Sequence, residues 1–154
     1  MFHGLSALAL DDKGRMAVPT KYRETLMQLC EGKLVMTVNA LSADHCLWLC
    51  PQPQWMKIVA KLNELPAYSK QSNSLKHLLL GYAEDIQMDG HGRLLVPPQL
   101  REFAGLDKHI ALVGQGNKFE IWNKQAWDEG CSEWLAEITH EDGQLPPELA
   151  SLTL

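Results

Sequence analysis

The sequence predicts an α+β fold built from two similar β-β-α-β-β units, with helices between and after them. A nine-residue segment, DDKGRMAVP at 11–19, returns as DGHGRLLVP at 89–97, an offset of 78 residues. The likeness continues into the following segment and gives the shared pattern D-x-x-G-R-x-x-V-P-x-x-x-R-E. Each copy is then followed by the same order of one short helix and two apolar strands. A repeat of this kind indicates two equivalent structural units in one chain.

Each copy begins with a strand, a tight turn and a second strand. Gly14 and Gly92 supply the turn position where φ can be positive without a Cβ clash. Pro19 and Pro97 suit the first turn of the helix that follows, because the leading N–H groups of a helix lack partners. The predicted strands are 7–10, 15–18, 33–38 and 46–49 in the first copy and 85–88, 93–96, 109–113 and 118–122 in the second, with helices at 20–29 and 98–104.

The second copy is the shorter one. Downstream of the helices the offset falls from 78 to 72, since 47–49 and Trp55 align with 119–121 and Trp127. Six residues are therefore missing, and we place the deletions in the helix end and in the hairpin loop. A unit of roughly 45 residues is too small for a core of its own. The two halves are therefore expected to share one core.

The rest of the chain reads as helices and connectors. Apolar residues at helical spacing predict a helix over 54–65 that ends at Pro66. The polar stretch 69–74 is interpreted as a connector and 75–80 as a short helix. Asn123 is expected to cap a last helix that runs to about Ile138, before a mobile terminus. The predicted division is 5–52 and 81–124 for the two units, 53–80 for the helical connector and 125–154 for the C-terminal helix and acidic tail.

The formal net charge of −5 hides an uneven distribution of charge. Seven of the 19 acidic residues lie from Asp128 onward, where there is no Lys or Arg, which leaves 12 acids against 14 bases in residues 1–127. Binding to phosphates depends on a local cluster of cations more than on the chain total. A negative chain therefore does not exclude nucleic acid. No apolar run is long enough for a membrane span and no signal segment is recognised, so we expect a cytoplasmic protein.

Metal, cofactor and catalytic chemistry find little support. Cys46 and Cys50 lie in an apolar stretch typical of a strand, and no second Cys/His pair follows at zinc spacing. They, Cys30 and Cys131 are interpreted as buried or incidental thiols outside any disulfide. No phosphate-binding loop and no recurring nucleophile or His is present. We therefore predict no metal, no cofactor and no enzymatic activity.

The doubled pattern, together with Met1-Phe2-x-Gly4 and Leu78-Leu79-Leu80-Gly81, closely resembles the MraZ family, and the resemblance covers nearly the whole chain. That family belongs to the AbrB/SpoVT swapped-hairpin superfamily. The resemblance implies two tandem AbrB-like units forming a pseudo-symmetric double-ψ-type barrel. It further implies a ring homo-oligomer, associated with the nucleoid, that binds direct repeats of double-stranded DNA. The target that the resemblance implies is the promoter upstream of the protein's own gene and of the division and cell-wall gene cluster, which the protein would repress.

The resemblance also assigns the DNA-facing positions, which are Lys13 and Arg15 in the first copy and Arg93 in the second. His91 stands in the second copy where the first has Lys13, so we expect the first turn to bind DNA more strongly. His3 stands where many relatives have Arg, which removes a fixed charge near the N-terminus and is expected to lower the affinity. Asp11 and Asp89 are interpreted as positioning residues, together with the turn glycines Gly14 and Gly92.

Further basic residues near the turns are candidates for phosphate binding, because a helix N-terminus beside cations favours an anion. These are Lys21 and Arg23, with Arg101 matching Arg23 in the repeat.

Each basic residue also has a structural interpretation. Arg15 can simply pair with Asp11 across its own turn. Arg23 and Arg101 can brace the turns against the helices, and Lys21 can be a solvated surface charge. The recurring Trp48, Trp55, Trp122 and Trp127 are interpreted as core or subunit interface. At the level of function, the alternatives are a protein-interaction ring and an antitoxin-like module without operator specificity.

Overall fold

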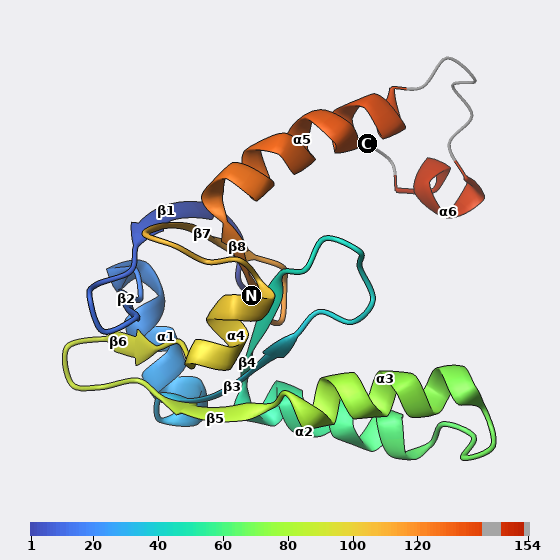
Figure 1. Cartoon of the computed structure of the whole chain (residues 1–154), viewed down its shortest axis with the longest axis horizontal. Coiled ribbons are helices and arrows are strands. Elements are labelled where there is room, and N and C mark those ends of the chain that lie inside the picture. Colours follow the sequence, from blue (N-terminus) through green and yellow to red (C-terminus); the bar gives the residue numbers. More distant parts are fainter. Residues whose placement is uncertain (140–145, 153–154) are drawn as a thin grey trace.

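The fold is that of a computed structural model, in which residues 1–139 and 146–152 are described. It is α+β, as predicted, with eight strands and six helices in the described part of the chain (Figure 1). The first half contributes β1 (Leu5–Ala9), β2 (Arg15–Ala17), α1 (Thr20–Cys30), β3 (Lys33–Val38) and β4 (Leu47–Pro51). The second half contributes β5 (Glu84–Gln87), β6 (Arg93–Leu95), α4 (Pro98–Phe103), β7 (His109–Gly114) and β8 (Phe119–Asn123). Between and after them lie α2 (Gln52–Asn63), α3 (Lys70–Gly81), α5 (Lys124–Ile138) and α6 (Pro147–Ala150).

The strands of the two halves pair with each other in two antiparallel sheets. One sheet has six strands in the order β1-β7-β8-β4-β3-β5, and the other has the two strands β2 and β6. The strands on either side of each turn therefore do not form one ladder together. β1 pairs with β7 and β2 pairs with β6, both from the other half. The division into separate domains at 5–52 and 81–124 stays a prediction, but neither segment forms a complete sheet alone.

An approximate twofold axis relates the halves and passes through two residue pairs. Met16 and Leu94 are 78 apart, occupy equivalent positions and face each other in β2 and β6. Trp48 and Glu120 are 72 apart and face each other in β4 and β8. Between them β3 and β7 correspond at an offset of 76, because Leu34 and Ile110 begin matching pairings. The six missing residues therefore divide into two at the helix end and four in the hairpin loop, as the sequence predicted.

The core is shared by the two halves, which confirms the prediction from their size. Its largest cluster takes Met16, Leu26 and Met36 from the first half and Leu94 and Phe119 from the second, all fully buried. Phe119 lies against the rings of Phe2 and Tyr22, with centroids 4.4 and 5.0 Å away. These buried contacts join residues of both halves in one cluster, so the halves stabilise each other.

The helical connector differs from the prediction. Most elements begin and end within two residues of the predicted bounds, but α3 starts at Lys70 rather than at residue 75. The polar stretch 69–74 was therefore wrongly interpreted as a connector. The Ser69 hydroxyl accepts a hydrogen bond from the Ser72 N–H at 3.2 Å and caps the helix. Polar residues suit this first turn, and Leu75 and Leu79 then pack α3 against α2 and β3.

The remaining predictions on buried and C-terminal residues have mixed outcomes. Trp48, Trp55 and Trp122 are buried, and the half-buried Trp127 packs against Trp122 under α5. Asn123 accepts from the Ala126 N–H and caps α5, as predicted. The expectation of a mobile terminus falls largely on 140–145 and 153–154, outside the described residues. Within the described part of the chain, α1 to α6 include no segment with the length and apolarity to cross a bilayer.

The shared core predicts that one substitution destabilises both halves. Phe119→Ala should lower the free energy of unfolding by about 3 to 5 kcal/mol, because a fully buried ring leaves a cavity. Urea unfolding followed by tryptophan fluorescence and by far-UV circular dichroism should show one coincident transition. The exposed Leu29→Ala is the control, with an expected change within about 0.5 kcal/mol. Two separate transitions in Phe119→Ala would contradict a shared core.

Candidate nucleic-acid interface

The first turn, residues 11–15, is organised by one carboxylate. Asp11 Oδ1 accepts hydrogen bonds from the Lys13 and Arg15 N–H groups at 2.9 and 2.8 Å. Its Oδ2 accepts from Arg15 Nε at 2.8 Å. The Asp11 N–H donates to the Arg15 carbonyl, and the Gly14 N–H donates back to the Asp11 carbonyl. The carboxylate therefore fixes both the backbone of the turn and the direction of its arginine side chain.

The second turn, residues 89–93, repeats this arrangement. Asp89 Oδ1 accepts from the His91 and Arg93 N–H groups at 2.8 and 2.9 Å, and Oδ2 accepts from Arg93 Nε at 2.9 Å. Gly14 and Gly92 have φ of 80° and 76°, which confirms the left-handed position predicted for both. In each turn one oxygen of the Asp carboxylate therefore accepts from two backbone N–H groups and the other accepts from the arginine Nε.

The hydrogen bonds lower the pKa of both carboxyl groups. The backbone N–H of Arg93 contributes most at Asp89, followed among the stabilising groups by the His91 N–H and the Arg93 guanidinium, and the pKa falls to about 2. The Arg15 backbone N–H is the largest cause at Asp11, whose pKa is also lowered. Both carboxylates therefore remain ionised and keep their guanidinium partners over the physiological range.

The two guanidinium groups are held but not sealed inside the protein. The side chains of Arg15 and Arg93 are 30% and 36% exposed. In the described residues each is recorded bonding through Nε alone, which leaves the two terminal nitrogens of each fork for another partner. Pairing with Asp and presentation to a ligand are therefore compatible, because the carboxylate uses one edge of the guanidinium only.

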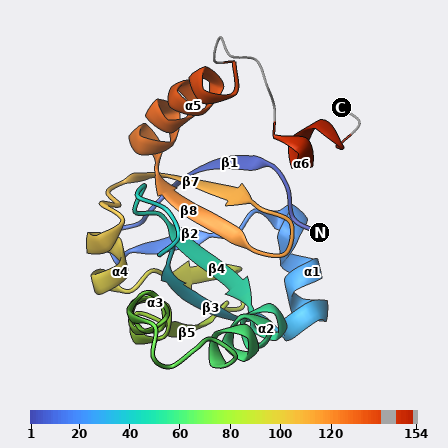
Figure 2. The same cartoon turned by 90° about the vertical axis from the view of Figure 1, so that its right-hand side faces the viewer.

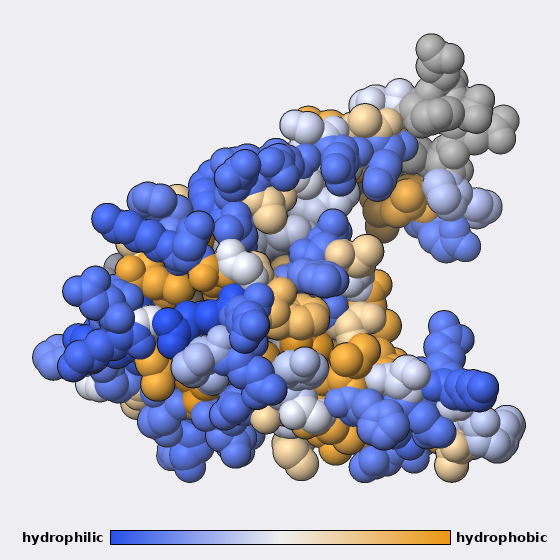
Figure 3. All heavy atoms as spheres, viewed as in Figure 1, coloured by the Kyte–Doolittle hydropathy of each residue, from blue (hydrophilic) through white to orange (hydrophobic). Residues whose placement is uncertain are grey.

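The two turns lie side by side at one end of the molecule (Figure 1). Each is bonded to the strand of the other half: the Val18 N–H donates to the Gly92 carbonyl at 2.8 Å, and the Val96 N–H donates to the Gly14 carbonyl at 2.9 Å. Hydrophilic side chains cover much of this end in the view of Figure 3. The turns therefore form a single surface, which we call the paired-turn surface (residues 11–15 and 89–93).

Arg23 and Arg101 lie beneath the turns rather than at their tips. A Cβ on Gly92 would stand 2.3 Å from Arg23 Nε, and one on Gly14 would stand 2.6 Å from Arg101 Cζ. Arg23 Nε also donates to the Val18 carbonyl at 2.7 Å, whereas the buried Arg101 Nε has no recorded protein partner. Each arginine thus supports the turn of the opposite half. This geometry favours bracing over direct contact with a ligand at the tips.

Of the other candidate residues, Lys13 and His91 lie in the turns, whereas Lys21 does not. Lys13 and His91 are exposed at equivalent places in the two turns. Lys21 is exposed too, but its Nζ lies 4.9 Å from the Tyr22 ring centre and close to Gly4. Gly4 precedes β1, whereas the first turn follows β1, so Lys21 lies at the far end of that strand. The structure does not bring Lys21 together with the first turn.

Asp107 and Lys108 are neighbours of the first turn that the sequence did not predict. A pocket of about 280 Å³ beside the first turn is lined by Arg101, Asp107 and Lys108, among others. A pocket of about 360 Å³ beside the second turn is lined by Arg23, Met27 and His91, among others. Lys108 adds a cation and Asp107 an acid next to the first turn. No spacing in the sequence signals them, because they come from the loop before β7.

The thiols show no sign of a metal centre in the described part of the chain. Cys30, Cys46 and Cys50 are buried and Cys131 is half-buried, and all four are free. Burial is the first cause that raises the pKa of Cys46 and Cys50 to about 12, so both stay protonated. Among residues 1–139 and 146–152, no three His, Cys, Asp or Glu side chains gather as a metal site would require.

Comparison with known proteins identifies similar sequences over the whole chain. The sequence model of one family, described as "MraZ protein, putative antitoxin-like", matches residues 1–78 and again 79–144. A protein of Methylococcus capsulatus is 50% identical over 153 residues, which cover 99% of each chain. Proteins of Halorhodospira halophila and Pseudomonas aeruginosa are 46% and 47% identical over 154 residues, the full length of each chain. All three relatives bear the name "Transcriptional regulator MraZ".

Because Arg101 lies close to Gly14, we predict that a side chain at position 14 destabilises the fold. Gly14→Ala should lower the free energy of unfolding by about 1 to 3 kcal/mol, because alanine disfavours the positive φ and its Cβ meets the guanidinium. Gly90→Ala is the matched control, since its Cβ would meet nothing within 4 Å. Chemical denaturation measures both. Equal effects of the two substitutions would contradict the packing of Arg101 against the turn.

The lowered pKa of Asp89 predicts how its turn responds to acid. In the folded protein the carboxyl should titrate near pH 2, below its ordinary value of about 3.9, so its stabilising effect is present above pH 3.9 and is lost as the pH falls through 2. Arg93→Ala should leave the pKa lowered, because the backbone N–H of residue 93 remains. Carboxyl carbon NMR measures this. A return to about 3.9 in that variant would show that the guanidinium is the main cause.

Proposed function

This chain belongs to the MraZ family, and on that premise we propose that it regulates transcription by binding double-stranded DNA through the paired-turn surface. The observation that carries the proposal is the duplicated turn. Two equivalent carboxylates hold two guanidinium groups at neighbouring, accessible places in the turns. An arginine held in this way can offer its fork to a guanine edge or to a phosphate.

The residues divide into two roles in this proposal. Lys13, Arg15 and Arg93 contact DNA, and His91 takes the place of Lys13 in the second turn. Arg23 and Arg101 act as positioning residues, because each lies against the glycine of a turn that it does not belong to. Lys21 is the weakest candidate for contact, since it lies with Gly4 and Tyr22.

The paired-turn surface holds three bases and three acids, so the proposal of a polyanionic ligand depends on which charges are free to bind and not on a net positive charge. Each turn carries its cation on a rigid backbone, and its Asp is already engaged in hydrogen bonds. The acidic helix α5 emerges from β8 and extends away from the turns (Figures 1 and 2). Phosphates approaching the turns therefore meet the cations first, and the overall charge of −5 has less influence at this surface.

Each subunit offers few cations, so we propose that binding is multivalent. A ring homo-oligomer would place several paired-turn surfaces against successive direct repeats, and avidity would multiply weak contacts. In this proposal the repeats lie upstream of the protein's own gene and of the division and cell-wall gene cluster, which it represses in the cytoplasm at the nucleoid. The interleaved pairing of the halves supports the swapped-hairpin barrel as the underlying architecture.

Removal of the first arginine tests the proposal. Arg15→Ala should weaken operator binding by roughly 10-fold or more while the assembly stays intact, because each good contact contributes about 1 to 3 kcal/mol and the loss recurs in every subunit. A gel shift on the upstream promoter measures affinity, and light scattering measures the assembly. Lys118→Ala, which removes one charge from the loop between β7 and β8, outside the paired turns and outside α2, α3 and α5, is the control and should bind normally.

A normal gel shift by Arg15→Ala would overturn the assignment of the surface. A wild-type oligomer with no preference for its own promoter over random DNA would instead favour the protein-interaction ring.

The difference between the turns predicts the effect of exchanging His91 and Lys13. His91→Lys should strengthen binding and steepen its salt dependence by about 0.9 per added phosphate contact, and Lys13→His should do the opposite. Both residues are exposed, so neither change should alter the stability of the fold by more than about 0.5 kcal/mol. Affinity measured at several salt concentrations tests this. Unchanged slopes in both variants would show that the turn tips do not meet phosphates.

A further inference from the structure

Two helical arms project from the body at opposite edges. One is α5, and the other is the hairpin of α2 and α3 (Figures 1 and 2). Both extend away from the end that carries the paired turns (Figure 1). Each arm carries exposed apolar side chains, and the two arms do not cover each other.

The outer part of α5 presents an apolar face with acidic neighbours. Near the sheet, Trp127 and Trp134 pack on Trp122 with ring centroids 5.6 and 5.4 Å away. Ile138 continues the same helical face beyond the sheet and is 66% exposed, and Leu135 beside it is 64% exposed. Glu133 and Glu137 are neighbours one turn apart, and neither has a recorded ion pair in the described residues.

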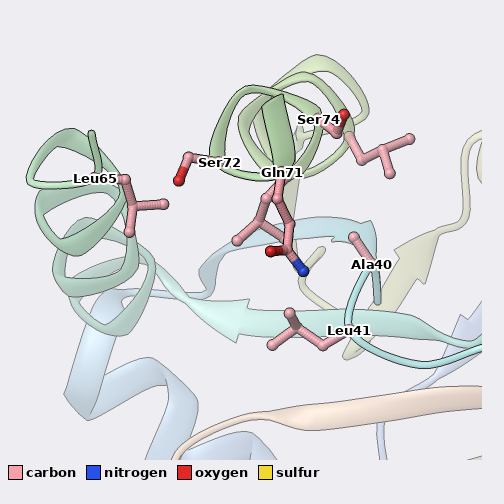
Figure 4. A pocket seen from close by; sticks show the side chains of 8 residues that line it. Ala40, Leu41, Leu65, Gln71, Ser72 and Ser74 are labelled. Atoms are coloured by element: carbon pink, nitrogen blue, oxygen red, sulfur yellow. The ribbon is translucent and has the colours of Figure 1, made fainter. Parts of the chain in front are cut away.

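The hairpin of α2 and α3 carries a pocket of about 320 Å³ that is lined by five apolar and three polar residues (Figure 4). Leu65 follows α2, Leu75 and Leu78 come from α3, and Leu41 reaches in from the loop between β3 and β4. Leu41 is 70% exposed and Leu78 is 39% exposed, so the pocket is open to a partner. We call it the hairpin groove (Leu41, Leu65, Leu75 and Leu78).

The hairpin is as basic as α5 is acidic. Between residues 52 and 81 it contains four lysines, at 57, 61, 70 and 76, against the single acid Glu64. No ion pair is recorded for these lysines in the described residues. In α5, Lys124 is already paired with Asp128 at 2.6 Å, which leaves three further acids, at 129, 133 and 137, against no other base. The two arms therefore match in apolar character and have opposite charge.

We propose that the outer end of α5 from one subunit docks in the hairpin groove of a second copy of this chain. Ile138 and Leu135 enter the groove, and the acids of α5 lie against the lysines of the hairpin. The contact is head to tail, because it joins two different surfaces, and successive contacts of this kind generate a ring when the rotation closes. The turns remain free, since they lie at the other end of the molecule. This inference rests on the proposed function in one respect, because it names the surfaces that join the subunits of the proposed ring.

Two exposed substitutions test the head-to-tail geometry. Ile138→Asp disables α5, and Leu41→Asp disables the groove. Each variant alone should be monomeric in light scattering. An equimolar mixture should form a heterodimer of two 17.3 kDa chains and nothing larger, because one complementary pair of surfaces remains. Leu29→Asp, at a leucine on α1 that is 49% exposed, is the control and should assemble as the wild type does.

Charge reversal gives a second, independent test. Glu133→Lys with Glu137→Lys makes α5 basic, and Lys61→Glu with Lys70→Glu makes the hairpin more acidic. Each double variant should fail to assemble, whereas their mixture should restore the wild-type assembly with alternating subunits. Thermal melting checks that all variants fold.

Folded variants of either set that keep the wild-type assembly would overturn the proposal, and so would folded, monomeric variants whose mixture stays monomeric. The readout contains no DNA, so the result is separate from the gel shift on Arg15→Ala. A negative result in the assembly tests would not affect the proposed DNA surface. A normal gel shift by Arg15→Ala would not affect the proposed subunit interface.

Discussion

The structure depends on the exchange of contacts between its two halves. The Val18 N–H bonds the carbonyl of Gly92, and the Val96 N–H bonds that of Gly14, so each turn is closed by the strand of its counterpart. The side chains of Arg23 and Arg101 make the same kind of contact, because each lies against the turn glycine of the other half. Neither turn can move alone, because its backbone partner belongs to the other half. A duplicated sequence thereby becomes one rigid surface rather than two independent loops.

This rigidity matters for a ligand that is a regular polyanion. A flexible arginine would lose side-chain entropy on meeting a phosphate, whereas Arg15 and Arg93 are already held by Asp11 and Asp89. The remaining affinity must come from repetition, since one subunit presents few cations. The opposite end of the molecule supplies a means of repetition, because its acidic and basic arms suit successive copies. We thus propose that DNA binding and assembly use separate ends of the same small fold.

Much of this architecture could be predicted from the repeat alone. The offsets of 78 and 72 predicted two equivalent units, and the pairings of Met16 with Leu94 and of Trp48 with Glu120 confirm them. The repeat could not show that β1 and β2 separate to pair with β7 and β6, because strand propensity does not encode the partner. Nor could spacing decide that Arg101 braces a turn 87 residues away, because that contact depends on how the halves interleave. The helical start of α3 was missed because a polar first turn looks like a linker.

In the proposed complex both turns face the same DNA. Asp12 and Gly90 stand at equivalent, exposed places beside the two arginines, so a photoreactive amino acid introduced at either position reports directly on what the turn touches. Covalent cross-links to operator DNA are expected from both positions and none from position 68, where Tyr68 is 90% exposed at the end of the hairpin. Cross-links from position 68 without any from positions 12 and 90 would contradict the proposed complex.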